Sequence, residues 1–221
     1  MTTIAAVYTG QGLSEPLRKI FEEYLPGCRL VNIIDDSLIH EVNEAGGVDK
    51  QVIRRLLKYY QIGADIGADI IINTCSSVGE VVDIARNIIE VPIVRIDEPM
   101  AKQAVEKYES IGVLATLPTT LNPTKRLIKS QASLLGKEVH ITEGLAKGAY
   151  QALIGGKPDE HDGLILETAR EIAGNVDCIV LAQGSMARMQ EKLHKETQTE
   201  VLSSPGLCAL YVKSLLGGSK R

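Results

Sequence analysis

The chain alternates short apolar runs with longer amphipathic stretches, and this alternation limits the possible folds more than any other feature. Residues 69–73, Asp-Ile-Ile-Ile-Asn, are apolar throughout their middle, which is typical of a strand buried on both faces of a parallel sheet. Residues 50–63 instead place their apolar side chains at helical spacing. The repeated strand–helix order predicts an α/β fold with functional residues in loops at the carboxyl ends of strands.

The same reasoning covers the rest of the chain. We expect further strands at residues 4–7, 29–34, 93–96, 110–115, 137–142, 177–182 and 199–202. We expect further helices at residues 17–24, 79–89, 122–135, 163–173 and 186–195, and a last helix after Pro205. The Asn122-Pro123 pair is predicted to begin one of them, and residues 157–162, which include His161, are predicted to form a polar loop.

An ordered internal repeat divides the chain into two similar halves. When Asp69 is aligned with Asp177, ADIIINTCSSVGEV matches VDCIVLAQGSMARM, and Cys75 falls on Gln183. Two more blocks repeat in the same order: IAAVYTG with IGVLATL, and VPIVRIDEPMA with TEVLSSPGLCA. The alternative is that any two strand–turn–helix segments look alike.

The repeat predicts two pseudo-symmetric lobes, each a mainly parallel four-stranded sheet flanked by helices. The first lobe would comprise residues 1–97 plus 206–221, and the second residues 98–205. If the lobes face each other, the loops that carry Cys75 and Gln183 would converge on an active site in the cleft between them.

The segment NTCSSVG, residues 73–79, leaves a predicted buried strand and enters a predicted helix. Unpaired N–H groups at a helix N-terminus attract anions and lower the pKa of a thiol. We therefore predict that Ser76 and Ser77 hold a carboxylate there while the Cys75 thiolate removes the proton from the adjacent carbon. The alternative is that Cys75 is a small packing residue and the serines are helix caps.

Other strand-end residues extend this candidate site. The turn Thr116-Leu117-Pro118-Thr119-Thr120 offers hydroxyls to a carboxylate, or only caps the next helix. Glu98 could bind a substrate amine or orient Cys75, or could favour the helix dipole. Besides Cys75 and Gln183 as catalytic residues, the predicted substrate-binding residues are Thr9, Asn73, Ser76, Ser77, Glu98, Thr116, Thr119, Thr120, Gly184 and Ser185.

Several function classes are disfavoured by what the sequence lacks. The formal net charge is −4, which argues against a nucleic-acid surface. No apolar stretch approaches the roughly 18 residues that span a bilayer, and no signal peptide is evident, so we expect a cytoplasmic protein without a membrane partner. The glycines at 10 and 12 do not complete a dinucleotide fingerprint, so we predict no nucleotide cofactor. The four histidines and four widely spaced cysteines show no metal-binding pattern, so we predict no metal site and four reduced thiols.

The residues INTCSSVGE, ATLPTT and LAQGSM resemble corresponding segments of the aspartate/glutamate/hydantoin racemase superfamily, which includes maleate isomerase and arylmalonate decarboxylase. The resemblance implies two pseudo-symmetric α/β halves and cofactor-independent chemistry on a small carboxylate-bearing substrate. It also implies a cysteine from each half, one removing the α-proton and the other reprotonating the opposite face. A homo-oligomer is a further expectation from the family.

This sequence departs from that pattern at Gln183, which stands where the second cysteine is expected. An amide is no general acid or base near neutral pH, but it can stabilise a developing enolate by hydrogen bonding. Cys208 is a further candidate for a second thiol, or a packing residue. We therefore expect an isomerase or racemase. The alternatives are a decarboxylase that needs a single thiol, and a carboxylate-binding protein without activity.

Overall fold

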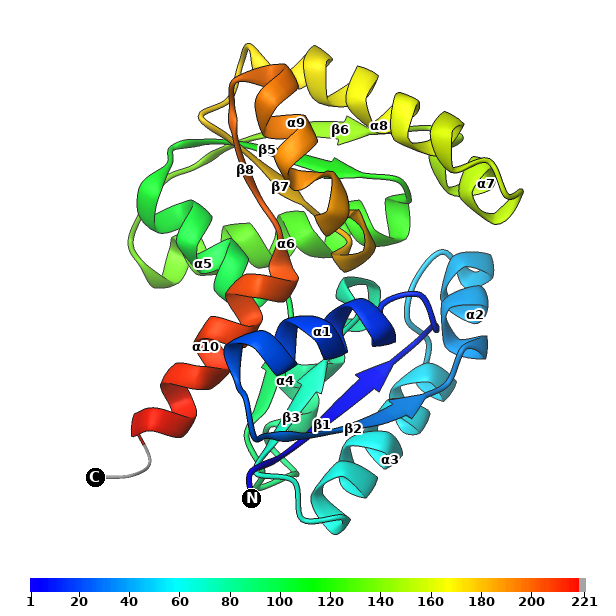
Figure 1. Ribbon diagram of the computed structural model, residues 1–221, viewed down its shortest axis with the longest axis vertical. Helices are drawn as coiled ribbons and strands as arrows, with labels where there is room; N and C mark the ends of the chain where they lie inside the picture. The colour runs from blue at the N-terminus through cyan, green and yellow to red at the C-terminus, as the bar shows by residue number, and fades with distance from the viewer. Residues whose placement is uncertain (219–221) are drawn as a thin grey trace. The chain divides into compact units, whose positions relative to one another are not determined.

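The computed structural model describes residues 1–218, and the chain divides into two compact units (Figure 1). Unit 1 comprises Met1–Pro99 and the chain from Pro205 on, and unit 2 comprises Met100–Ser204. Each unit contains one four-stranded sheet in which every strand pairs parallel with its neighbours, flanked by helices. The predicted α/β fold class is confirmed.

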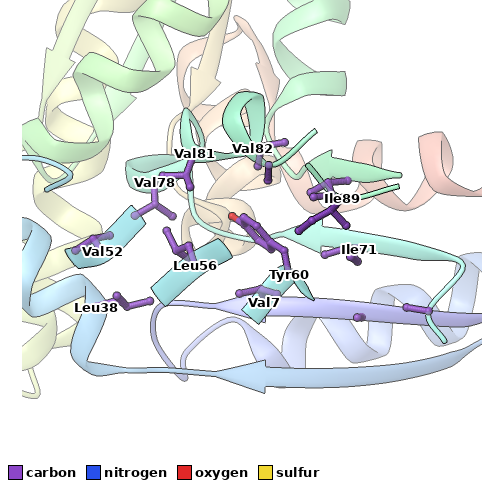
Figure 2. Packing of buried hydrophobic residues seen from close by; sticks show 14 of the residues in the cluster. Val7, Leu38, Val52, Leu56, Tyr60, Ile71, Val78, Val81, Val82 and Ile89 are labelled. Atoms are coloured by element: carbon purple, nitrogen blue, oxygen red, sulfur yellow. The ribbon is translucent and has the colours of Figure 1, made fainter. Parts of the chain in front are cut away.

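The sheet of unit 1 has the order β2-β1-β3-β4 and is buried on both faces. Its strands are β1 (Thr3–Tyr8), β2 (Arg29–Ile34), β3 (Ile70–Asn73) and β4 (Ile93–Arg95). One face packs against α2 (Ser37–Ala45), α3 (Lys50–Asp65) and α4 (Val81–Ala85), as Figure 2 shows. The other face packs against α1 (Ser14–Tyr24) and α10 (Ser204–Gly218).

The sheet of unit 2 has the order β6-β5-β7-β8 and repeats this layout. Its strands are β5 (Ser110–Ala115), β6 (His140–Leu145), β7 (Cys178–Leu181) and β8 (Glu200–Leu202). One apolar face packs against α7 (Ala149–Ile154), α8 (Pro158–Ala173) and α9 (Gln190–Thr197). The remaining helices are α5 (Glu98–Lys107) and α6 (Pro118–Leu134).

The same hydrogen bonds, two accepted by side chains and two by the backbone, recur in the two units. Asp69 Oδ2 accepts from the Thr3 N–H at 2.8 Å, and Asp177 Oδ2 accepts from the Ser110 N–H at 2.8 Å. At the other end of these strands, the residue just before Cys75 donates its N–H to the Val7 carbonyl at 3.1 Å. The residue just before Gln183 donates likewise to the Leu114 carbonyl at 2.9 Å. Cys75 and Gln183 therefore occupy equivalent positions, in agreement with the predicted alignment.

The segments after these two residues differ from the single long helices that the sequence predicts. Residues 79–89 were expected to be helical, but the chain forms a 3₁₀ turn, η1 (Ser76–Val78), and then the five-residue α4. The predicted helix at 186–195 is likewise divided into η2 (Gly184–Met189) and α9. Serine and glycine favour turns over helix interiors, which accounts for the 3₁₀ starts.

Other boundaries also shift. The short helices α2 and α7 are absent from the sequence-based prediction, because their 9 and 6 residues leave few turns in which a helical period can be recognised. The predicted polar loop at 157–162 is wrong, since α8 begins there with Pro158 and two acidic residues in its first turn. Pro118, rather than Asn122-Pro123, begins α6. The strand predicted at 137–142 lies at His140–Leu145.

Two whole-chain features bear on the predicted location and thiol state. Within residues 1–218, no helix combines the length and the apolar character needed to cross a membrane. None of the four cysteines forms a disulfide bond. Cys178 and Cys208 are fully buried, and burial is the main reason that the pKa of both thiols is raised, to about 12 for Cys178. Cys208 lies in the apolar core of unit 1, which favours the packing role over a second acid–base thiol.

Candidate active site

Cys75 lies two residues beyond the carboxyl end of β3 and is half-buried. Its backbone is extended, with φ −121° and ψ 118°, and it directly precedes η1. The Thr9 side chain, the backbone and side chain of Ser77, and the Val78 backbone all hydrogen-bond to its thiol. The thiol is therefore surrounded by polar groups that stabilise its charged form.

Burial nevertheless raises the pKa of the Cys75 thiol above its usual value, and the hydrogen bonds from Thr9, Ser77 and Val78 lower it only in part. The prediction of a lowered pKa at a helix N-terminus is wrong. A 3₁₀ turn of three residues supplies no helix dipole comparable to that of a long helix, and desolvation outweighs the hydrogen bonds that remain.

The predicted carboxylate-binding serines are both buried within η1. The backbone and side chain of Ser77 and the side chain of Thr9 are among the hydrogen-bonding groups that lower the pKa of the Cys75 thiol. These contacts give Ser77 and Thr9 a role in holding and polarising the thiol. Contacts of Ser76 with a substrate carboxylate stay a prediction.

A buried amide side chain, that of Asn73, is hydrogen-bonded to the backbone of the Cys75 loop. Asn73 is fully buried, and its Oδ1 accepts from the Tyr60 hydroxyl at 2.9 Å. Its Nδ2 donates to the Cys75 carbonyl at 2.9 Å. This geometry favours a positioning role for Asn73 over the predicted contact with substrate. The sequence analysis missed Tyr60, although a tyrosine on the apolar face of a helix signals a buried hydroxyl that needs a partner.

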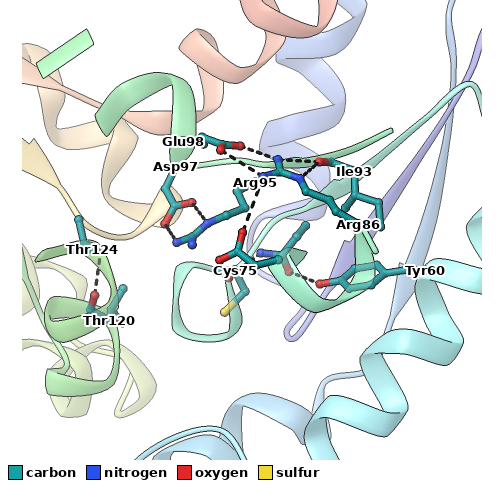
Figure 3. A network of polar contacts seen from close by, with 11 residues as sticks. Tyr60, Cys75, Arg86, Ile93, Arg95, Asp97, Glu98, Thr120 and Thr124 are labelled. Atoms are coloured by element: carbon teal, nitrogen blue, oxygen red, sulfur yellow. Dashed lines mark hydrogen bonds and ion pairs between the residues drawn. The ribbon is translucent and has the colours of Figure 1, made fainter. Parts of the chain in front are cut away.

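A buried ion pair lies beside the same loop (Figure 3). Arg95, at the end of β4, pairs with Asp97 through two hydrogen bonds of 3.1 Å. A side chain at Gly79 would place its Cβ 2.5 Å from Arg95 Nη2, so any larger residue there would require the Arg95 guanidinium to shift. The sequence analysis overlooked this pair too, although an arginine within the otherwise apolar run at 93–96 was a visible signal.

Glu98 does not present an unpaired carboxylate. It opens α5 and forms an ion pair with Arg86, with its Oε2 2.7 Å from Nη2 (Figure 3). Arg86 also donates to the Ile93 carbonyl at 2.8 and 2.9 Å. The two predicted roles of Glu98, binding an amine or orienting Cys75, gain no support from these contacts, which instead tie α4 to β4 and α5.

In unit 2, the amide of Gln183 is bound to Thr116. Gln183 Oε1 accepts from the Thr116 N–H at 2.7 Å and from its hydroxyl at 3.0 Å, and Gln183 Nε2 lies 2.8 Å from Thr116 Oγ1. Thr116 follows β5 as Thr9 follows β1. A threonine–amide pair in unit 2 thus stands where unit 1 has a threonine–thiol pair.

The other predicted residues of unit 2 are distributed over this loop and the start of α6. Thr119 and Thr120 lie in the first turn of α6, and Thr120 is buried. Gly184 and Ser185 begin η2, and Ser185 is exposed. Their contacts with substrate stay predictions.

The η2 segment is anchored to α8. Arg188, near the end of η2, pairs with Asp162, with Nη1 donating to Oδ2 at 2.7 Å. Asp162 Oδ1 also lies 2.7 Å from His161 Nδ1, and His161 is buried in α8 rather than placed in a charged loop. Among residues 1–218, no group of three or more His, Cys, Asp and Glu side chains is arranged to hold a metal ion.

These features define an α/β protein built from two repeat-related units, each with a polar loop at the carboxyl end of its third strand. The sequence model of the Asp/Glu/Hydantoin racemase family matches residues 14–209, and the chain belongs to this family. No curated protein sequence matches the chain.

Solved structures of similar fold include racemases of three kinds. Glutamate racemase isoform RacE1 from Bacillus anthracis is 12% identical, with a TM-score of 0.78 over 99% of this chain and 83% of that one. Allantoin racemase from Klebsiella pneumoniae is 16% identical, with a TM-score of 0.69 over 99% and 89%. Aspartate racemase from Picrophilus torridus is 13% identical, with a TM-score of 0.73 over 97% and 94%. At such identities the likeness concerns the fold.

Proposed function

We propose that the protein is a cofactor-independent isomerase or racemase whose acid–base group is the Cys75 thiol. Its substrate would be a small acid or an amino-acid derivative that carries a proton on the carbon next to a carboxylate. The observation that carries the proposal is the set of hydrogen bonds from Thr9, Ser77 and Val78 to the Cys75 thiol, in a chain of the racemase family.

The chemistry follows from this arrangement. The thiolate form of Cys75 takes the α-proton and becomes a thiol, and the electron pair of the broken C–H bond passes into the substrate carboxylate as an enediolate. Return of a proton to that carbon completes the exchange. Hydrogen bonds from Thr9 and Ser77 stabilise the thiolate before it takes the proton and after the proton has been returned, which offsets part of the desolvation of the sulfur.

Gln183 supports a second candidate function, decarboxylation. Two-sided racemisation uses an acid–base group in each half of the repeat, and Gln183 cannot supply a proton at neutral pH. A decarboxylase needs only one proton donor: the bond between the α-carbon and one carboxylate breaks with release of carbon dioxide, its electron pair passes into a second carboxylate as an enediolate, and the donor then protonates that carbon. In that reaction Cys75 would act as the acid, and the amide of Gln183 could stabilise the oxyanion.

Proton exchange in D₂O separates the candidates. A panel of small carboxylic acids and amino acids is incubated with the protein, and α-deuterium incorporation, configuration and carbon dioxide release are followed by NMR. Exchange with inversion supports the isomerase. Carbon dioxide release, or exchange with retention, supports the one-thiol lyase. Binding of a dicarboxylate without either reaction would contradict both and indicate a binding protein.

Replacing the thiol tests its place in either reaction. We expect Cys75→Ser to lower turnover at least about 10²-fold, because a hydroxyl is a far weaker acid and base than a thiol. Cys28→Ser is the matched control, since it changes another incompletely buried cysteine of unit 1. Unchanged turnover in Cys75→Ser would remove Cys75 from the mechanism.

A further inference from the structure

The two units differ at one buried position directly beneath their strand-end loops. Val7 pairs with Asn73 in the sheet of unit 1, and Leu114 pairs with Leu181 in the sheet of unit 2. Asn73 and Leu181 are therefore equivalent in the repeat, and both are fully buried. Unit 2 fills the position with an apolar side chain that belongs to its hydrophobic core. The fold itself thus does not require an amide there.

In unit 1 the amide links a core tyrosine to the backbone of Cys75. The Tyr60 ring lies within the apolar cluster of α3, α4 and the sheet, as Figure 2 shows. A backbone carbonyl only accepts hydrogen bonds, so the Cys75 carbonyl must face the Nδ2 of Asn73. The Oδ1 of Asn73 is then left for the Tyr60 hydroxyl, which donates to it. Each hydrogen-bonding group in this hydrogen-bonded series therefore acts only as a donor or only as an acceptor, and this fixes which side of the Asn73 amide faces Cys75.

Burying an amide and a phenol is unfavourable compared with burying leucine and phenylalanine, even when the two are hydrogen-bonded to each other. The buried amide occurs in the unit whose loop carries a thiol, and leucine takes its place in the unit whose loop carries Gln183. The presence of the buried amide in unit 1 alone is therefore explained by a structural requirement of the Cys75 loop and not by a requirement of the sheet.

We propose that Tyr60 and Asn73 are positioning residues for Cys75: they hold the Cys75 peptide so that its thiol meets Thr9 and Ser77. The expected effect of Tyr60 and Asn73 on turnover rests on the proposed acid–base function of Cys75. Their expected effect on the reactivity of the Cys75 thiol is independent of that function. Loss of the pair would release the Cys75 carbonyl and let the loop move away from the donors to the sulfur. Burial also raises the pKa of Tyr60 far above its usual value, so its hydroxyl remains a donor over the whole working pH range.

The test replaces Asn73 with the leucine that unit 2 has at the equivalent position, and Tyr60 with phenylalanine. In the double variant Tyr60→Phe/Asn73→Leu both polar partners are removed together, so neither is left buried without a partner, and the protein should fold with an unchanged thermal midpoint. The rate of Cys75 alkylation by iodoacetamide is measured across pH 6–11, by mass spectrometry of the peptide that contains Cys75. We expect the midpoint of this profile to rise by roughly half a unit or more, and the rate at pH 8 to fall about three-fold.

The matched control is Tyr59→Phe, which removes the neighbouring hydroxyl of α3 from its 2.6 Å bond with Asp35. This variant should alkylate like the wild type. The proposal would be overturned if the folded double variant had the wild-type pH profile of Cys75 alkylation. It would also be overturned if Tyr59→Phe shifted the midpoint of that profile as much as the double variant does. If the double variant does not fold, the single variant Tyr60→Phe, which loses one oxygen atom, is measured in the same way and judged by the same criteria.

Turnover separates this inference from the proposed function. Alkylation needs no substrate, so a shifted profile in a protein that turns over no acid would keep the positioning role and refute the proposed activity. With an active substrate, we expect the double variant to lower kcat about ten-fold while KM changes less than two-fold, because substrate binding does not depend on the position of the thiol. A change in KM alone would contradict a role in positioning Cys75.

Discussion

At the scale of single residues, the main feature of the site is the balance between burial and hydrogen bonding that sets the pKa of the Cys75 thiol. Burial disfavours the thiolate of Cys75, and the hydrogen bonds from Thr9, Ser77 and Val78 oppose this effect without cancelling it. A thiol with a raised pKa is protonated at neutral pH, so the resting enzyme would hold its proton ready for delivery. Formation of the thiolate base would become easier as the pH rises.

Thr9 makes this balance testable. The variant Thr9→Val keeps the shape of the side chain but removes a hydrogen bond to the thiolate, so the pKa of Cys75 should rise further. Less thiolate is then present at pH 8, and we expect alkylation of Cys75 to slow roughly three-fold. Thr3→Val, at the opposite end of β1, serves as the control. A faster reaction in Thr9→Val would show that its hydroxyl does not stabilise the thiolate.

At the scale of elements, the turn after Cys75 is confined by the strand beside it. The guanidinium of Arg95 lies against Gly79 and is held in place by its buried pairing with Asp97. The arginine cannot retreat without breaking that ion pair, and breaking a buried ion pair is strongly destabilising. Gly79 is therefore a requirement of packing between η1, α4 and β4.

We accordingly expect Gly79→Ala to lower the free energy of unfolding by about 1–3 kcal/mol, the usual effect of forcing extra volume into a packed site. Urea unfolding followed by circular dichroism measures it. The control is Gly163→Ala in α8, where an added Cβ meets no atom within 4 Å and helix propensity favours alanine. Equal stabilities for the two variants would contradict this account of Gly79.

The elements also show what the sequence can specify. The strands around residues 69–73 and 110–115 were predicted well, because wholly apolar runs bounded by polar turns admit few alternatives. The helix predicted at 79–89 is shortened to α4 and preceded by the 3₁₀ turn η1, which was not predicted, because it depends on tertiary contacts such as Arg95 against Gly79. The helix α7 escaped prediction because six residues carry too little periodicity.

The candidate site was predictable to a similar degree. The sequence located Cys75 at a strand end and aligned it with Gln183, and the recurring hydrogen bonds of the two units support that alignment. It could not show that Asn73 turns inward to Tyr60, because a strand residue at the last position can face the core or the loop. The pKa direction of Cys75 was wrong because burial of a side chain depends on packing that a sequence does not show.

At the scale of the whole molecule, one repeated architecture carries two different strand-end chemistries. Thr9 with a thiol in unit 1 corresponds to Thr116 with an amide in unit 2. The shared backbone geometry means that position 183 can be changed without altering the scaffold beneath it.

We expect Gln183→Cys to increase α-proton exchange with inversion on any substrate that the wild type deprotonates, because a second titrating group would then occupy the repeat-equivalent position. Chiral chromatography of products formed in D₂O measures it. The control is Gln190→Cys, which places a thiol in the same unit but within α9, where the native amide bonds to the Val201 carbonyl. No gain in Gln183→Cys would argue that the second half takes no part in proton transfer.

The way α10 completes unit 1 has a consequence for biosynthesis. Ala209 and Val212 of this helix lie fully buried in the same core as Ile4 and Ala6 of the first strand. A ribosome releases the first strand long before it has made the helix that covers it, whereas the residues of unit 2 are contiguous and emerge together. Until α10 is made, the nascent chain therefore leaves the part of this sheet face that α1 does not cover exposed, and premature termination shortly before α10 would leave that part permanently open to aggregation.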